Sequence, residues 1–264
     1  MKNYIEISNI DLNTKWINYN QTRLKGDKKT SNKILNDFII GLLKENEQTI
    51  ESFVYGICKS TLDTEKILSN NGTDVSESEI RIQHNLFKKI LLPILVKKYK
   101  ENDALYIRWI GQLEQFFFSD SNTTKSFLID INDRLREAVM FDKKTNEYKT
   151  IESRYFHTQS FFVKSYTIKP EQKTLDLILI SLAQKINFAT HELPFAILRD
   201  ADVFLKEIEY FESYYEQLDS KEKWRKALDE WKFIGLHWKI FSENTNKYQD
   251  FVNYLIKNNI ENYA

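Results

Sequence analysis

The chain contains one short pattern of residues whose types and spacing could support metal-dependent hydrolysis. Glu147-Tyr148-Lys149 lies on the second strand of an expected β-hairpin, with Asp142 or Asp133 upstream. Carboxylates at such positions can hold Mg²⁺, and a lysine beside them can steady the attacking water. The sequence therefore raises a hydrolase hypothesis that depends on Asp142, Glu147 and Lys149.

This arrangement resembles that of metal-dependent nucleases of the restriction type, which carry an Asp and a Glu-x-Lys on such a hairpin. Those enzymes also require a larger mixed sheet. The rest of this sequence does not predict one, because the chain has only 6 Gly and 3 Pro to form turns. A nuclease is accordingly the alternative hypothesis and not the first one.

The remaining residues capable of chemistry are scattered. None of the four histidines, His84, His157, His191 and His237, forms a ligand pair, and Phe195 stands where a zinc protease motif beginning at His191 needs its second histidine. The glycines are isolated, so no phosphate-binding loop is indicated. Cys58 has no histidine near it in the sequence. We therefore predict no catalytic residue, no metal and no cofactor.

A helix expected over about 195–218 carries acidic residues on one face. At ~100° per residue, its apolar positions gather on one side, and five carboxylates occupy an adjacent arc roughly 100° wide. The apolar set is Phe204, Ile208, Phe211, Tyr215 and Leu218. The acidic set is Asp202, Glu209, Glu212, Glu216 and Asp219, with Tyr210 and Tyr214 beside it.

Two interpretations of this acidic stripe are open. It can be a solvated face balanced by lysines of neighbouring helices, since runs of charge commonly serve solubility. It can also be a docking face for a basic protein, in which negative potential speeds the encounter and Tyr210 or Tyr214 anchors the partner.

Three further carboxylates project into apolar arcs of the expected helices. They are Asp200 and Glu207 on the acidic helix, and Glu114 on an aromatic helix over about 103–118. A buried, unpaired carboxylate is costly, so each should have an Arg, Lys, Tyr or backbone partner, or else lie in a cleft as a catalytic group.

Composition indicates a folded, mostly α-helical protein. Of the 264 residues, 42% are hydrophobic, 14% aromatic and 29% charged. Lys+Arg and Asp+Glu number 38 each, so overall charge does not favour nucleic acid or an anionic membrane. The single cysteine, the absence of an apolar run after Met1 and the lack of a membrane-length apolar segment predict a cytoplasmic location.

Hydrophobic periodicity predicts a succession of helices. We expect them near 11–24, 31–45 with Thr30 or Ser31 as N-cap, 47–59, 80–100 with a kink at Pro93, 103–118, 123–140, 170–190, 195–218, 221–243 and 245–257. Trp224, Trp231 and Trp238 recur every seventh residue and so line one flank of a helix capped by Ser220. Arg108, Gln112 and Gln115 form the polar side of the 103–118 helix. Residues 154–168 can be strand or helix.

These observations predict a single helical domain over 1–264, built as an aromatic-rich multi-helix bundle or an array of helical hairpins. A small β-hairpin near 138–151 would join sub-halves 1–140 and 152–264. The first function hypothesis is a non-enzymatic protein-binding module of the immunity or antitoxin type, which masks a basic toxin or enzyme with the acidic stripe. A scaffold that binds peptides in a groove is a further alternative. Neither nucleic acid nor a membrane is an expected partner.

Overall fold

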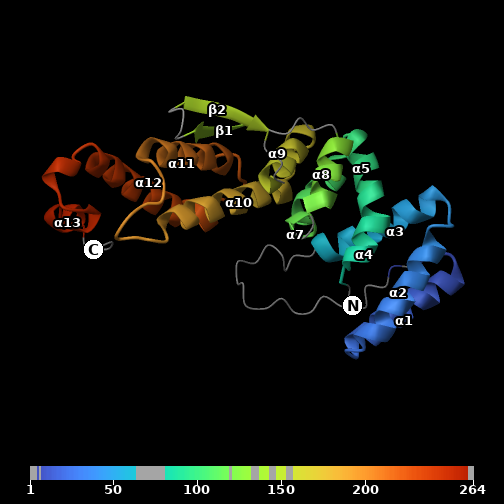
Figure 1. Ribbon diagram of the computed structural model, residues 1–264. Helices are drawn as coiled ribbons and strands as arrows, with labels where there is room; N and C mark the ends of the chain where they lie inside the picture. The colour runs from blue at the N-terminus through green and yellow to red at the C-terminus, as the bar shows by residue number, and fades with distance from the viewer. Residues whose placement is uncertain are drawn as a thin grey trace. The chain divides into compact units, whose positions relative to one another are not determined.

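The computed structural model describes residues 5, 7–63, 81–118, 121–131, 137–142, 147–152 and 157–260, with only the backbone for Ser121 and the two strands. The described chain is predominantly α-helical, as the sequence predicts (Figure 1). Its contacts divide it into two compact units, Met1–Ile168 and Lys169–Ala264. The expectation of one domain stays a prediction.

The first unit contains most of the secondary-structure elements. They are α1 (Ile10–Leu24), α2 (Lys28–Leu42), α3 (Glu47–Leu62), α4 (His84–Leu86), a π-helical turn (Phe87–Leu91), α5 (Leu92–Lys100), α6 (Ala104–Gln112), α7 (Glu114–Phe118), α8 (Ser121–Asp130), β1 (Glu137–Asp142), β2 (Glu147–Glu152) and α9 (Thr158–Ile168). The segment left open by the sequence, 154–168, therefore contains a helix.

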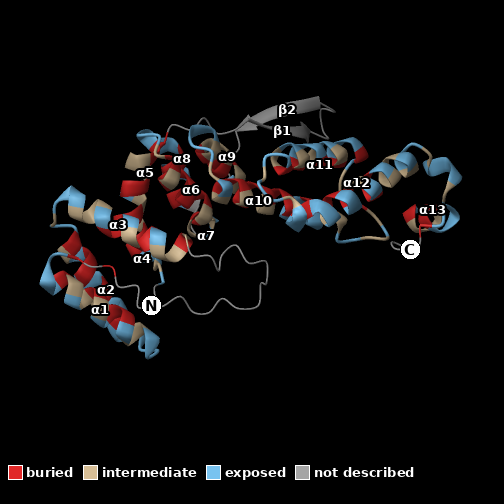
Figure 2. Cartoon of the chain, turned by 180° about the vertical axis from the view of Figure 1, so that it is seen from behind, coloured by how far each residue is buried: buried red, intermediate tan, exposed pale blue. Residues whose placement is uncertain are grey.

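Large aromatic side chains fill the core of this unit. Trp16 of α1 lies edge-on to Phe53 of α3 with 5.1 Å between ring centroids, and Phe38 of α2 packs against both rings. α6 is almost entirely buried, as its wide apolar arc predicts (Figure 2). At Gly111 of α6, an added Cβ would lie 2.5 Å from the Phe162 ring of α9. Glycine at that position allows α6 and α9 to pack closely.

One helix start in this unit differs from the expectation. α2 begins at Lys28 and not near 31, because the Asp27 carboxylate accepts a hydrogen bond from the Thr30 backbone N–H (3.0 Å) and starts the helix earlier.

Arg108, on the predicted polar side of its helix, is buried. It is 3% exposed, and its guanidinium lies 3.0 and 3.1 Å from the two carboxylate oxygens of Asp63, which compensates the buried charge.

The segment from α4 to α5 is one continuous helix that widens before Pro93. A proline inside a helix has no N–H to donate and its ring clashes with the carbonyl four residues earlier. Here the backbone forms a π-helical turn over Phe87–Leu91, which places Pro93 in the first turn of α5. The kink predicted at Pro93 is thus replaced by a wide turn just upstream.

β1 and β2 pair as an antiparallel two-stranded sheet. In its register Glu137 faces Glu152, and Asp142 faces Glu147. The residues expected to form the connecting turn, 143–146, lie outside the described residues.

The second unit is a series of helices that pack consecutively: α10 (Gln172–Thr190), α11 (Ala201–Tyr215), α12 (Glu222–Ser242), a 3₁₀ turn (Thr245–Lys247) and α13 (Phe251–Lys257). α11 contacts both α10 and α12. Phe211 of α11 lies edge-on to Trp231 of α12, with 5.1 Å between centroids. Trp224 and Trp231 are each 7% exposed, so the prediction of a buried tryptophan flank is confirmed for these two indoles.

Three helix starts in this unit differ from the expectation. α11 begins at Ala201 and not near 195, because the Asp200 carboxylate accepts hydrogen bonds from the backbone N–H groups of Asp202 and Val203 and acts as N-cap. α12 begins at Glu222 after Lys221, without a side-chain cap, so Ser220 does not cap it. α13 begins at Phe251, where Asp250 accepts a hydrogen bond from the Asn253 N–H. Among the described residues, no helix combines the length and hydrophobicity needed to cross a membrane.

Candidate functional site: the acidic face of α11

Three of the predicted acidic residues lie on one exposed line of α11. Asp202, Glu209 and Glu216 are seven residues apart, so they follow one another along the helix and its C-cap. All three are exposed, and the side chains of Asp202 and Glu216 are 69% and 56% accessible. Glu212 lies on the flank towards α12, and Asp219 follows the end of the helix.

Lysines of the following segment pair with three of these carboxylates. Lys239 Nζ lies 3.1 Å from Asp202 Oδ1. Glu212 pairs with Lys232, and Glu216 with Lys221. Lysine numbers fall as carboxylate numbers rise, as they must between the antiparallel helices α11 and α12. These pairs join the two helices at their solvent side.

The pairing changes the proton affinity of one lysine. The hydrogen bond from Lys239 to Asp202 raises the pKa of the lysine, and the negative charges of Asp202, Glu243 and Glu209 act in the same direction. Lys239 therefore stays charged over the whole physiological range. Glu209 has no ion pair among those found in the described part of the chain, although its charge acts on Lys239.

The two predicted tyrosine anchors lie beside the acidic line and not within it. Tyr210 follows Glu209 by one residue, hence by ~100° around the helix. It is 43% exposed and lies edge-on to Tyr214, with 5.2 Å between centroids and 3.2 Å between the two hydroxyl oxygens. The structure thus brings the acidic residues and tyrosines onto one helix as two adjoining surfaces.

The three carboxylates predicted to need partners have them. Asp200 accepts hydrogen bonds from the backbone N–H groups of Asp202 (3.0 Å) and Val203 (3.4 Å). Glu207 Oε1 lies 3.7 Å from Arg199 Nε, while its buried Oε2 accepts no hydrogen bond from the described residues. Glu114 accepts a hydrogen bond from the Thr158 hydroxyl. Each contact is consistent with the structural interpretation of these residues.

The backbone places two residues of the nuclease hypothesis opposite one another, since Asp142 and Glu147 are register partners at the end of the hairpin. Lys149 pairs with Met140. The side chains of these residues lie outside the described part of the structure. Within that part, no group of three or more His, Cys, Asp or Glu residues is placed to hold a metal ion.

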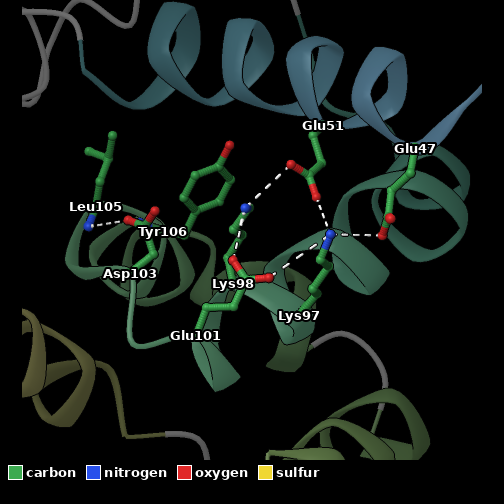
Figure 3. A network of polar contacts seen from close by, with 8 residues as sticks. All are labelled: Glu47, Glu51, Lys97, Lys98, Glu101, Asp103, Leu105 and Tyr106. Carbon is green, nitrogen blue, oxygen red and sulfur yellow. Dashed lines mark hydrogen bonds and ion pairs between the residues drawn. The ribbon is translucent and has the colours of Figure 1, made fainter.

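One ionic network was not anticipated from the sequence. Lys97 of α5 lies 2.9 Å from Glu47 and 2.5 Å from Glu51 of α3, while Lys98 contacts both Glu51 (3.3 Å) and Glu101 (2.9 Å), as Figure 3 shows. The hydrogen bond from Lys97 lowers the pKa of Glu51. Because each charge has an opposite partner, this network joins α3 to α5 through ion pairs.

Cys58 of α3 is fully buried, and burial raises the pKa of its thiol, which disfavours the reactive thiolate.

Comparisons of the chain with models of known protein families, with curated proteins and with solved structures find no match.

Proposed function

We propose that this protein is a helical, non-enzymatic protein-binding module of the immunity or antitoxin type, which masks a basic partner with the acidic face of α11. The observation that carries the proposal is the alignment of Asp202, Glu209 and Glu216 on one exposed line. Two of these carboxylates remain more than half accessible while engaged in ion pairs.

A partner has to displace the lysines that pair with this face, Lys239 of α12 and Lys221 just before that helix. Ion pairs between exposed side chains contribute little stability, so Lys239 and Lys221 can be displaced at small cost. An arginine fits a carboxylate better than a lysine does, because its planar guanidinium donates two parallel hydrogen bonds. The partner that suits this face therefore presents arginines about seven helical residues apart, beside an apolar group that reaches Tyr210.

The test changes the charge of the line from negative to positive while keeping the fold. The triple variant Asp202→Asn/Glu209→Lys/Glu216→Gln makes this face more positive and leaves the charge of every other surface unchanged. Affinity purification from the source cells should recover a basic protein with the wild type and not with this variant. For the purified pair, association should slow and the dependence of affinity on salt should flatten.

The matched control places the same change in charge on the exposed side of α12, as Glu222→Gln/Asp229→Asn/Glu230→Lys. It should bind the partner like the wild type. Circular dichroism should show equal helix content in all three proteins. Recovery of the same partner by the α11 variant at both low and high salt would refute the proposal and leave the stripe as a solvated surface.

A further inference from the structure

A cavity in the first unit gives this protein a second candidate binding site, separate from the acidic face of α11. It has a volume of about 670 Å³, within the usual range for small-molecule sites. It lies among the last turn of α3, the start of α4, the end of α6 and α7. The lining residues are Thr61, Leu62, Arg81, Ile82, Gln83, His84, Gln112, Leu113, Gln115 and Phe116.

The electrostatics of this cavity favour an anion. No carboxylate belongs to its lining, whereas Arg81 contributes a permanent positive charge. Asp63 follows the lining residue Leu62. Its two carboxylate oxygens lie 3.0 and 3.1 Å from the guanidinium of Arg108, so its charge is compensated. An anionic group in the cavity would therefore meet a guanidinium without facing an uncompensated carboxylate from the described residues.

One neutral polar group of the lining is held in a fixed orientation. Gln112 donates from Nε2 to the backbone oxygen of Leu62 (2.9 Å), which fixes the orientation of its carboxamide. Its Oε1 is buried away from solvent, so the carboxamide serves as part of the wall and does not offer this oxygen to a ligand.

The other side of the cavity is apolar and held in place. The Phe116 ring stacks on Phe87, with 4.6 Å between centroids and 24° between planes, and His84 stacks on Phe116 at 6.3 Å and 21°. Leu62, Ile82 and Leu113 extend this wall. The lining thus combines one cation, several amides and a rigid apolar surface.

We propose that this cavity binds a small organic carboxylate with an apolar body. The carboxylate pairs with Arg81, and the apolar body packs against Phe116. This site does not depend on the protein-binding function proposed for α11.

Two probes that differ only in charge test the proposal: N-acetylphenylalanine and its neutral analogue N-acetylphenylalaninamide. Titration of the full-length protein, followed by isothermal calorimetry or by protein NMR, should show binding of the carboxylate and at least tenfold weaker binding of the amide. Arg81→Gln should weaken carboxylate binding about tenfold or more, the usual effect of losing a charged hydrogen bond, and leave amide binding unchanged.

Two further variants separate loss of the site from loss of the fold. Arg225→Gln, on the exposed side of α12, makes the same substitution away from the cavity and should bind like the wild type. Gln115→Trp, at an exposed lining position, should abolish binding by filling the cavity while melting like the wild type. Failure of the wild type to bind N-acetylphenylalanine at millimolar concentration, or equal binding of both probes, would overturn the proposal, as would tight binding of inorganic phosphate alone.

Discussion

Replacing Trp231 of α12 by alanine should destabilise the second unit strongly, because its indole is 7% exposed and packs edge-on against Phe211. A buried aromatic side chain removes about 150–250 Å² from water, which at about 25 cal/mol per Å² corresponds to about 4–6 kcal/mol. The unfolded chain already buries part of that area, so we expect a loss of about 3–5 kcal/mol.

The measurement is urea unfolding followed by circular dichroism and by tryptophan fluorescence. The matched control is Leu236→Ala on the same helix, where the side chain is 56% exposed and the loss should stay below about 1 kcal/mol. If Trp231→Ala and Leu236→Ala unfold at the same urea concentration as the wild type, the indole does not contribute to the core, and the argument for a structural tryptophan flank is wrong.

Three further predictions follow from contacts in the two units. Gly111→Ala should destabilise the protein by about 1–2 kcal/mol in thermal or urea unfolding, because the clash of its Cβ with Phe162 outweighs the better helix propensity of alanine; an unchanged midpoint would contradict this. Asp200→Ala should cost about 1 kcal/mol through loss of the α11 N-cap, whereas Asp200→Asn should retain most of the stability. The pKa of Glu51 is lowered by Lys97, so the stability difference between wild type and Glu51→Gln should be complete above the ordinary Glu pKa of 4.5 and shrink as the pH falls through the lower folded-state value; a difference that persists in strong acid would refute the assignment.

Helix positions could be predicted from the sequence where one face is continuously apolar. The seven-residue spacing of Trp224 and Trp231 and the apolar run of α10 suffice, since burial of such a face determines both the helix and its orientation. Helix starts were harder, because several residues compete to cap each helix. At α2 and α11 a carboxylate, Asp27 or Asp200, acts as the cap, whereas we expected the Thr30 or Ser31 hydroxyl to cap the first of these helices.

The candidate site could be predicted from the sequence only in part, because some of its contacts join residues that lie far apart in the sequence. The alignment of Asp202, Glu209 and Glu216 follows from helical geometry alone. Their lysine partners come from another helix, and only the packing of α12 on α11 brings Lys239 to Asp202. The buried pair of Arg108 with Asp63 likewise joins residues far apart in sequence. The cavity beside α4 has no sequence signature, because its lining comes from three separate segments.

The π-helical turn at Phe87–Leu91 also fixes the angular relation between the two ends of its helix. A turn of this kind contains one residue more than an α-helical turn, so it completes one rotation with an extra residue. If the same residues formed regular α-helix instead, at ~100° per residue, the part before the turn would rotate by about a quarter of a turn relative to α5. Phe87 would leave the ring of Phe116, and His84 would turn away from the cavity. The wide turn itself, and not only the composition of this segment, is therefore a condition for forming that wall.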